Sequence, residues 1–489
     1  MVKSADSHNE IGRESESELK TLNPSVYRVQ PTNETQLTAT SGFSPWTIFW
    51  VALLGLVSAN FMVSVLAAAI NELAQEFSVD RSLMRWVVTG PNLGFAVLAV
   101  TAGKLADLYG RRQAFLVSLV GSGLFGLLSA FAWSAESLIA FRTLSAIFGS
   151  ATGPAGIAII FTQFEAAKRI RVLGWWGLVM AGGPVAGIVI CGPLIDLYSW
   201  RWVFIAQVPI TALAFILGYK VFPSTSRKTD IKFDIPGTFL LAAGLSALLA
   251  AINRGPIWGW GSTSISVLTS ISVVLLVLFF FQEKRAVAPL IPVEYFRRRN
   301  FVIPMLSQVF TNFAYMGAGF VLTPLFIAEV YGHSVTRTSY LITSRPLFFA
   351  LAGPLVGFAG ARLGERVLSV SGAFFVAVSA CLLSLANATS GDLFIFVALG
   401  VAGFGLGVMQ PAMTSVITNA VEEKDVATAG GAQQMMWQLG TAGGIEILGS
   451  VQESREPISG LVGSYNEAFM IAAGFAFLGM LLVSFVRRV

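Results

Sequence analysis

The chain has 489 residues, of which 55% are apolar and only 12% are charged, and its mean hydropathy is +0.71. This composition excludes an ordinary soluble globular protein and indicates a protein with many membrane spans. The net charge of +5 does not indicate nucleic-acid binding, because the Lys and Arg residues are scattered over short segments between apolar runs.

Reactive side chains are few and far apart. Cys191 and Cys381 lie inside apolar runs, and His8 and His333 lie in polar segments. Two cysteines are too few for a disulfide framework, and no His, Cys or acidic residues are spaced as metal ligands or as a nucleophile with its base. We therefore expect no metal, no cofactor and no enzyme activity.

The first 44 residues differ from the rest of the chain. They are polar, rich in Ser, Glu, Thr and Asn, and do not have the basic and then apolar pattern of a signal peptide. Segments with so few apolar residues cannot form a packed core. We expect residues 1–44 to be a disordered cytoplasmic tail.

The apolar runs after this tail are long enough to cross a bilayer as helices. They predict fourteen spans, at 46–70, 86–106, 113–133, 137–160, 172–194, 201–221, 235–253, 264–282, 302–328, 338–359, 367–387, 392–418, 428–450 and 466–486. Assigning both termini and every second loop to one side collects 24 of the 32 Lys and Arg residues there, against 6 on the other side. Because basic loops stay in the cytoplasm, both termini are predicted to be cytoplasmic.

One short charged loop, Gly103–Arg112, lies between the second and third predicted spans. Gly103 and Gly110 permit close backbone approach, and Asp107 is placed to meet the positive start of a helix or one of the arginines, Arg111 and Arg112. We expect these five residues to form a loop that gates conformational change.

The loop resembles the signature sequence of the major facilitator superfamily, G-x-L-a-D-r-x-G-r-r, although Leu108 stands where a basic residue is usual. A second, weaker copy is present: Gly357, Gly364 and Arg366 each lie 254 residues after their counterparts, and Ala361 replaces the aspartate. The resemblance and the repeat imply an all-α polytopic protein with the major facilitator fold. Its parts would be a six-helix half at 45–221, two extra helices and a cytoplasmic linker at 222–300, and a second six-helix half at 301–489.

The fifth predicted span contains Gly183-Pro184-Val-Ala-Gly187. This segment resembles the family's antiporter motif, G-P-x-x-G, and so the chain is most similar to the fourteen-helix drug:proton antiporters, which export their substrates. The alternative interpretation is generic helix packing, because small residues let helices approach closely in lipid.

Three charged residues are predicted to lie inside spans, where an unpaired charge is costly. Arg142 matches the fourth-helix arginine to which the family gives a role in proton coupling, and Glu446 is a second coupling candidate. Arg345 lies at a similar depth, so that the three residues would meet in one cavity. Arg142 and Glu446 could instead reach the outer interface.

The first span departs from the family pattern. Alignment places Met62 where fourteen-helix antiporters usually carry an aspartate, so the usual coupling carboxylate is missing. Polar and aromatic side chains inside spans are candidates for the substrate cavity, or else for helix-to-helix packing. They are Phe61, Asn92, Asn312, Arg345, Gln410, Gln434 and Gln438.

These observations predict a monomeric secondary transporter of the plasma membrane, with the bacterial inner membrane favoured. Its partners would be a small-molecule substrate, protons and the lipid bilayer, with no nucleic acid. We expect it to export small amphipathic compounds or drugs by proton antiport with alternating access. Because Met62 replaces the aspartate, a facilitator or importer of a small metabolite or organic anion, without standard proton coupling, is the alternative. A receptor or scaffold would leave the paired loops unexplained.

Overall fold

The computed structural model describes residues 42–60, 70–79, 81–84, 86–165, 168–169, 171–177, 179, 198–223, 233–333 and 335–487. Contacts divide the chain into two units, residues 1–40 and 41–489, and every described residue belongs to the second unit. Several predicted features lie outside the described residues. They are nearly all of the tail at 1–44, the antiporter motif of Gly183, Pro184 and Gly187, and Phe61 and Met62.

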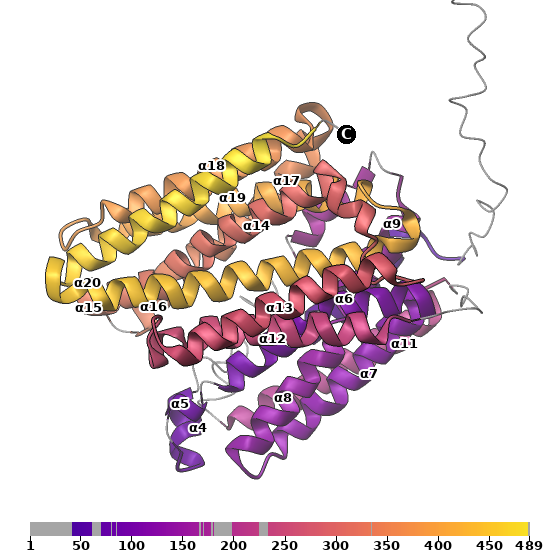
Figure 1. The fold of residues 1–489 in the computed structure, drawn as a ribbon, viewed down its shortest axis with the longest axis horizontal. Coiled ribbons are helices and arrows are strands. Elements are labelled where there is room, and N and C mark those ends of the chain that lie inside the picture. The colour runs from indigo at the N-terminus through magenta and orange to yellow at the C-terminus, as the bar shows by residue number, and fades with distance from the viewer. Residues whose placement is uncertain are drawn as a thin grey trace, which may run out of the picture. The chain divides into compact units, whose positions relative to one another are not determined.

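Every regular element in the described part of the chain is helical (Figure 1). Up to residue 223 these are α2 (Pro45–Asn60), α4 (Ile70–Glu76), α5 (Arg81–Met84), α6 (Trp86–Tyr109), α7 (Arg111–Ala130), α8 (Ala135–Gly149), α9 (Thr152–Gln163) and α11 (Trp200–Val221). The middle of the chain forms α12 (Ile235–Trp258), α13 (Thr263–Arg285) and η3 (Val293–Arg297).

The remaining helices are α14 (Arg299–Met316), η4 (Gly317–Leu322), α15 (Thr323–Tyr331), α16 (Val335–Ile342), α17 (Ser344–Leu363), α18 (Glu365–Ser384), α19 (Gly391–Asn419), η5 (Glu423–Asp425) and α20 (Val426–Ser484). The long α20 contains two predicted spans, and Gly460, with a φ of 72°, interrupts it between them. In Figure 1 the chain accordingly turns back on itself within α20.

The prediction of an all-helical chain is confirmed for the described residues. Nine helical segments among them are long and apolar enough to cross a membrane. The count of fourteen spans stays a prediction, because most of the predicted span at 172–194 and the end of the one at 46–70 lie outside the described residues.

The hairpin formed by α12 and α13 is fixed by polar caps at its helix starts. The Asp234 carboxylate accepts a hydrogen bond from the Gly237 N–H group at the start of α12, and the Ser262 hydroxyl accepts one from the Ile265 N–H group at the start of α13. Such side chains replace the backbone partners that the first turn of a helix lacks. The two helices therefore begin where the apolar sequence begins.

This hairpin packs where α6 and α20 meet. Ala96 and Val100 of α6, Leu241 and Leu245 of α12, and Ala429 of α20 belong to one buried apolar cluster. On its other side α13 exposes apolar side chains, including Val273 and Val274. An apolar exposed face is what a helix presents to lipid, because hydrocarbon does not penalise apolar surface.

Glycines let the backbones of neighbouring helices touch. A Cβ atom added to Gly444 of α20 would lie only 2.2 Å from the carbonyl oxygen of Phe313 in α14, and one added to Gly440 would lie 2.4 Å from that of Val309. Close backbone approach of this kind holds helices together in lipid by dispersion contacts. The contact between α14 and α20 is therefore intolerant of larger residues at these positions.

The two copies of the signature loop have the same backbone form. Gly110 precedes α7 with a φ of 108°, and Gly364 precedes α18 with a φ of 77°. Both values lie in the left-handed region, where a residue with a Cβ is strained. This shared geometry, 254 residues apart in the sequence, agrees with the predicted repeat.

Replacing Gly444 with alanine tests the packing of α14 against α20. Because the new methyl group would meet the Phe313 carbonyl, Gly444→Ala is expected to lower the free energy of unfolding by about 1–3 kcal/mol. Gly449→Ala is the matched control in the same helix, since a Cβ there would meet nothing within 4 Å. Thermal unfolding in detergent measures both, and equal melting temperatures would contradict a close contact at Gly444.

Candidate functional site

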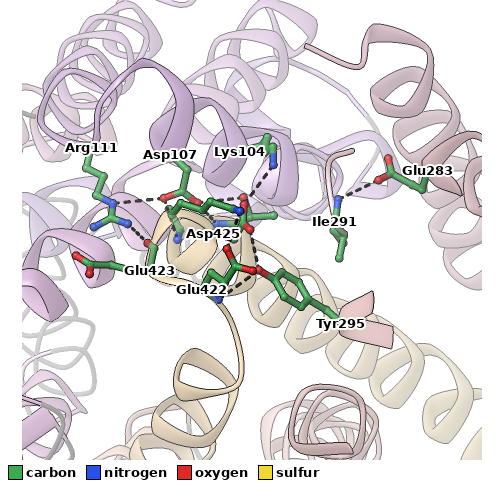
Figure 2. A network of polar contacts seen from close by, with 12 residues as sticks. Lys104, Asp107, Arg111, Glu283, Ile291, Tyr295, Glu422, Glu423 and Asp425 are labelled. Carbon is green, nitrogen blue, oxygen red and sulfur yellow. Dashed lines mark hydrogen bonds and ion pairs between the residues drawn. The ribbon is translucent and has the colours of Figure 1, made fainter. Parts of the chain in front are cut away.

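The Asp107 carboxylate joins the last turn of α6 to the first turn of α20. It accepts hydrogen bonds from the Ala427 N–H group at 3.3 Å, the Thr428 N–H group at 2.8 Å and the Thr428 hydroxyl at 3.1 Å (Figure 2). Helix starts have unpaired N–H groups and a partial positive charge, so they bind anions well. The carboxylate thus links the predicted N-terminal half to the predicted C-terminal half.

Glycine makes this link possible. A Cβ atom on Gly103, one turn before Asp107, would lie 2.3 Å from the Ala427 carbonyl oxygen, and one on Gly431 of α20 would lie 2.2 Å from that of Ala99. A real Cβ atom cannot lie so close to a carbonyl oxygen, so neither position has room for a side chain. The two helices therefore meet backbone to backbone beside the carboxylate.

Arg111 ties the same carboxylate to other elements. Its Nε lies 3.3 Å from Asp107 Oδ1, its Nη1 donates to the Ala158 carbonyl oxygen at 3.3 Å, and its Nη2 donates to the carbonyl oxygen of Glu423. Arg112, by contrast, donates to the Tyr219 carbonyl oxygen in α11. Of the two predicted gating arginines, the structure brings Arg111 to the contact between the halves and places Arg112 within the first half.

A second set of contacts lies beside the first (Figure 2). Lys104 Nζ lies 3.3 Å from Asp425 Oδ1, the Tyr295 hydroxyl donates to Asp425 Oδ2 at 2.7 Å, and the Glu422 N–H group donates to the Tyr295 oxygen at 3.2 Å. Lys104, Tyr295 and Asp425 are all buried. We call the contacts of Lys104, Asp107, Arg111, Tyr295 and Asp425 the latch.

Sequence reasoning missed Lys104, Tyr295 and Asp425. Lys104 lies inside the recognised loop, and Asp425 lies three residues before the predicted span at 428–450, so both carried a usable signal. Tyr295 lies in the linker after α13 and carried no such signal, because nothing about an isolated Tyr indicates that its partner is Asp425, 130 positions later.

Burial sets the charge state of the latch. Asp107, which lies just beyond the predicted span at 86–106, has its pKa raised to about 6 by burial, while Arg111 and the donors of Thr428 and Ala427 oppose the rise. Burial, together with the hydrogen bond to Asp425, raises the pKa of Tyr295 well above its usual range. At neutral pH the Asp107 carboxyl is therefore mainly ionised, and Tyr295 keeps its proton.

Further basic side chains cross between helices at this end of the unit. Arg169 Nη1 donates to Asn419 Oδ1 at 3.1 Å, and Arg298 Nη1 donates to the Ala420 carbonyl oxygen at 2.7 Å. Asn300, at the start of α14, exchanges hydrogen bonds with Arg487, so the C-terminal end of α20 lies at the same end as the latch.

The two predicted intramembrane arginines are buried in the same manner. Arg142 Nε donates to the Val87 carbonyl oxygen at 3.0 Å, and Arg345 Nη1 donates to the Tyr315 carbonyl oxygen at 3.1 Å. The Arg345 guanidinium also lies 4.6 Å from the centre of the Tyr315 ring. A buried guanidinium needs such acceptors, since desolvation penalises its charge.

Glu446 is placed elsewhere. Its Oε1 accepts a hydrogen bond from Asn253 Nδ2 at 3.0 Å, which joins α20 to α12. In the described part of the chain no ion pair joins Glu446 to Arg142 or Arg345. That these three residues meet in one cavity stays a prediction, and so do their coupling roles.

Amide side chains gather between α14, α19 and α20. Gln433 Nε2 donates to Gln308 Oε1 at 3.1 Å and to Thr414 Oγ1 at 2.9 Å. Among the described residues, both amide atoms of the fully buried Asn312, and Gln410 Oε1, have no hydrogen-bond partner. Buried polar atoms without partners are uncommon, so these atoms are candidates to bind a substrate or water.

The other cavity candidates differ in burial. Asn92, Gln434 and Gln438 are partly buried, whereas Asn312 is fully buried. Asn92 comes from α6, and Gln434 and Gln438 come from α20. Their assignment to a substrate cavity stays a prediction.

Comparison with known proteins identifies the family. The model of the Major Facilitator Superfamily matches residues 52–440 and 304–489. The tetracenomycin C resistance and export protein of Streptomyces glaucescens is 26% identical over 412 residues, covering 84% of this chain and 76% of its own length. The riboflavin transporter RibZ of Clostridioides difficile is 25% identical over 452 residues, which cover 91% of this chain and 98% of RibZ.

The fold agrees with solved structures. The structure of a proton:xylose symporter of this superfamily superposes with a TM-score of 0.65, at 13% identity, covering 92% of this chain and 97% of that one. At this level of identity the likeness concerns the fold alone. The resemblance that rested on Gly103–Arg112 is confirmed by the family match, and the chain belongs to the major facilitator superfamily of membrane transporters.

Proposed function

We propose that the chain is a secondary transporter that exports small amphipathic compounds, drugs among them, by proton antiport with alternating access. The latch is the observation that carries the proposal, because it joins α6 to α20 through an ionised carboxylate and a helix start. When such polar contacts break, their groups can bond to water instead. Contacts of this kind can therefore close one side of a transporter and open again during each cycle. The resistance and export name of a relative supports the outward direction.

Alternating access requires two bodies that rock about a site between them. In our proposal these bodies are residues 45–221 and 301–489, with residues 222–300 as an added hairpin and linker. The latch would close the cytoplasmic side of a plasma membrane, bacterial as in the relatives, with both termini on that side. The amide cluster around Asn312 and Gln410 is the proposed lining of the substrate path.

Energy for export would come from protons. One proton that moves inward yields about 2.3 kcal/mol for each 100 mV of membrane potential, before any pH gradient is added. A coupling group has to bind that proton. Arg142 and Glu446 are the proposed participants, since Met62 occupies the usual position of the carboxylate.

The alternative is a facilitator or importer of a metabolite or organic anion. The buried guanidinium groups of Arg142 and Arg345 favour it, because each donates to a backbone carbonyl and neither forms an ion pair with an acidic side chain among the described residues. The relative named as a riboflavin transporter is consistent with a metabolite substrate.

Transport in proteoliposomes tests the proposal. The purified full chain is expected to move lipophilic cations and neutral drugs uphill only while a proton gradient is present, and an uncoupler should stop this movement. Arg142→Ala should abolish transport and yet give folded protein, whereas Glu165→Gln, at a carboxylate that is 78% exposed, should transport normally. Uphill movement that survives the uncoupler would reject proton coupling, and downhill movement of organic anions alone would favour the alternative.

Replacing Asp107 with asparagine tests the latch itself. The amide keeps one acceptor for Thr428 but loses the charge that faces Arg111 and the start of α20, which is expected to cost about 1–2 kcal/mol and to lower the closed fraction about tenfold. Spin labels at Gln113→Cys and Val367→Cys, in a chain without Cys191 and Cys381, report the separation of α7 and α18.

The matched control is Ala361→Ser, at the equivalent position of the second loop. It should leave the distance distribution as in the unsubstituted chain, because only the first loop has the aspartate. An equal effect of both substitutions would show that the latch does not depend on the Asp107 charge.

A further inference from the structure

Two carboxyl groups lie together at one end of the hairpin of α12 and α13. Asp234, which is 8% exposed, precedes α12, and Glu283, which is 2% exposed, lies in the last turn of α13. Asp234 Oδ1 accepts hydrogen bonds from Gly237 N and Gln282 Nε2, both at 3.0 Å. Glu283 Oε2 accepts one from Ile291 N at 3.1 Å (Figure 2). One oxygen of each carboxyl is thus well bonded.

The second oxygen of each carboxyl has no such partner. Asp234 Oδ2 and Glu283 Oε1 are both buried, and neither has a hydrogen-bond partner among the described residues. The two atoms flank the same space, since a Cβ atom added to Gly237 would lie 2.3 Å from Asp234 Oδ2 and 2.9 Å from Glu283 Oε1. Two ionised carboxylates in this arrangement would repel each other and leave both oxygens unsatisfied.

We propose that Asp234 and Glu283 share one proton, held between Asp234 Oδ2 and Glu283 Oε1, and so form a proton-binding site in the inserted hairpin. A single proton removes one negative charge and converts one oxygen into a donor for the other. It therefore satisfies both unpartnered atoms at once. The pair also supplies the titratable carboxyl that the first predicted span does not have at Met62.

A proton suits the site better than a metal ion does. Ca²⁺ takes six to eight oxygen ligands and Mg²⁺ takes about six, whereas among the described residues two carboxyl oxygens, Asp234 Oδ2 and Glu283 Oε1, are the ones found nearest to this space. Elsewhere in the described residues, too, no three or more His, Cys, Asp and Glu side chains group together to hold a metal ion.

The site is linked to the latch through Lys104, and this step rests on the proposed role of the latch. The Lys104 ammonium group acts electrostatically on Glu283, and it lies 3.3 Å from Asp425, which Tyr295 also contacts. Release of the shared proton adds a negative charge that competes with Asp425 for Lys104. The protonated pair therefore favours a closed latch, and the deprotonated pair loosens it.

Infrared spectroscopy of the full chain in lipid nanodiscs at pH 7 tests the shared proton. The unsubstituted chain should show the C=O band of a protonated carboxyl, and Asp234→Asn and Glu283→Gln should each lose it. Both variants should fold, because an amide N–H group can donate where the shared proton did. Asp107→Asn and the exposed Glu165→Gln should keep the band, since neither touches the pair.

Retention of the band in both amide variants, or its absence from the unsubstituted chain, would overturn the proposal. So would loss of the band on addition of NaCl or MgCl₂ at constant pH, which would assign the space to a cation. Transport is not measured in this experiment, so failure of the export proposal would leave the band unchanged.

The link to the latch has its own readout, with the spin labels at Gln113→Cys and Val367→Cys. Between pH 7 and 9, above the pKa of about 6 of Asp107, the closed fraction of the otherwise unsubstituted chain should fall several-fold. In Glu283→Gln it should stay constant over the same range, because the amide cannot release a proton. An equal pH response in both proteins would overturn the link through Lys104.

Discussion

An anion held against the start of a helix is the interaction on which the rest of this structure depends. Asp107 occupies the unpaired N–H groups of α20, and its position requires that Gly103 and Gly431 bring two backbones into contact. Arg111 balances the charge and connects it to α9 and to the segment before α20. The Asp107 side chain is almost fully buried, so its hydrogen bonds form in surroundings of low dielectric constant, where they are stronger than in water.

Two kinds of contact thus hold the helices together, and they differ in how easily they part. The contact of α14 with α20 is made mainly of glycine backbone against carbonyl oxygen, over several turns, and it includes the buried hydrogen bond between Gln433 and Gln308. The latch is made of charges and hydrogen bonds at helix ends. In the proposed transport cycle, the polar contacts of the latch are the place where the two predicted halves would separate.

The features that sequence reasoning predicted well depend on local pattern. The helices result from apolar runs, and the conformations of Gly110 and Gly364 result from a glycine at a tight turn between two spans. Contacts between distant segments are not specified by the sequence pattern of either segment. They determine the partners of Lys104 and Tyr295, and also the oxygens of Asp234 and Glu283 that have no hydrogen-bond partner. The hydrogen bond of Glu446 with Asn253 was not predicted for the same reason, since depth in a membrane does not determine which helix a side chain faces.

Asp107 and Thr428 are separated by 321 positions, and so are Lys104 and Asp425. During synthesis from the N-terminus, α6 is therefore complete long before its partners exist. Lys104, Asp107 and Arg111 must remain hydrated through that interval, which a position at the rim of the bilayer allows and its interior does not. Asp107 and Arg111 can pair with each other earlier, whereas Lys104 gains its partner Asp425, and Asp107 gains the N–H groups of Ala427 and Thr428, only when the segment with these three residues arrives. In this chain, the closure that a transport cycle would open and re-form is thus also among the last contacts that biosynthesis can make.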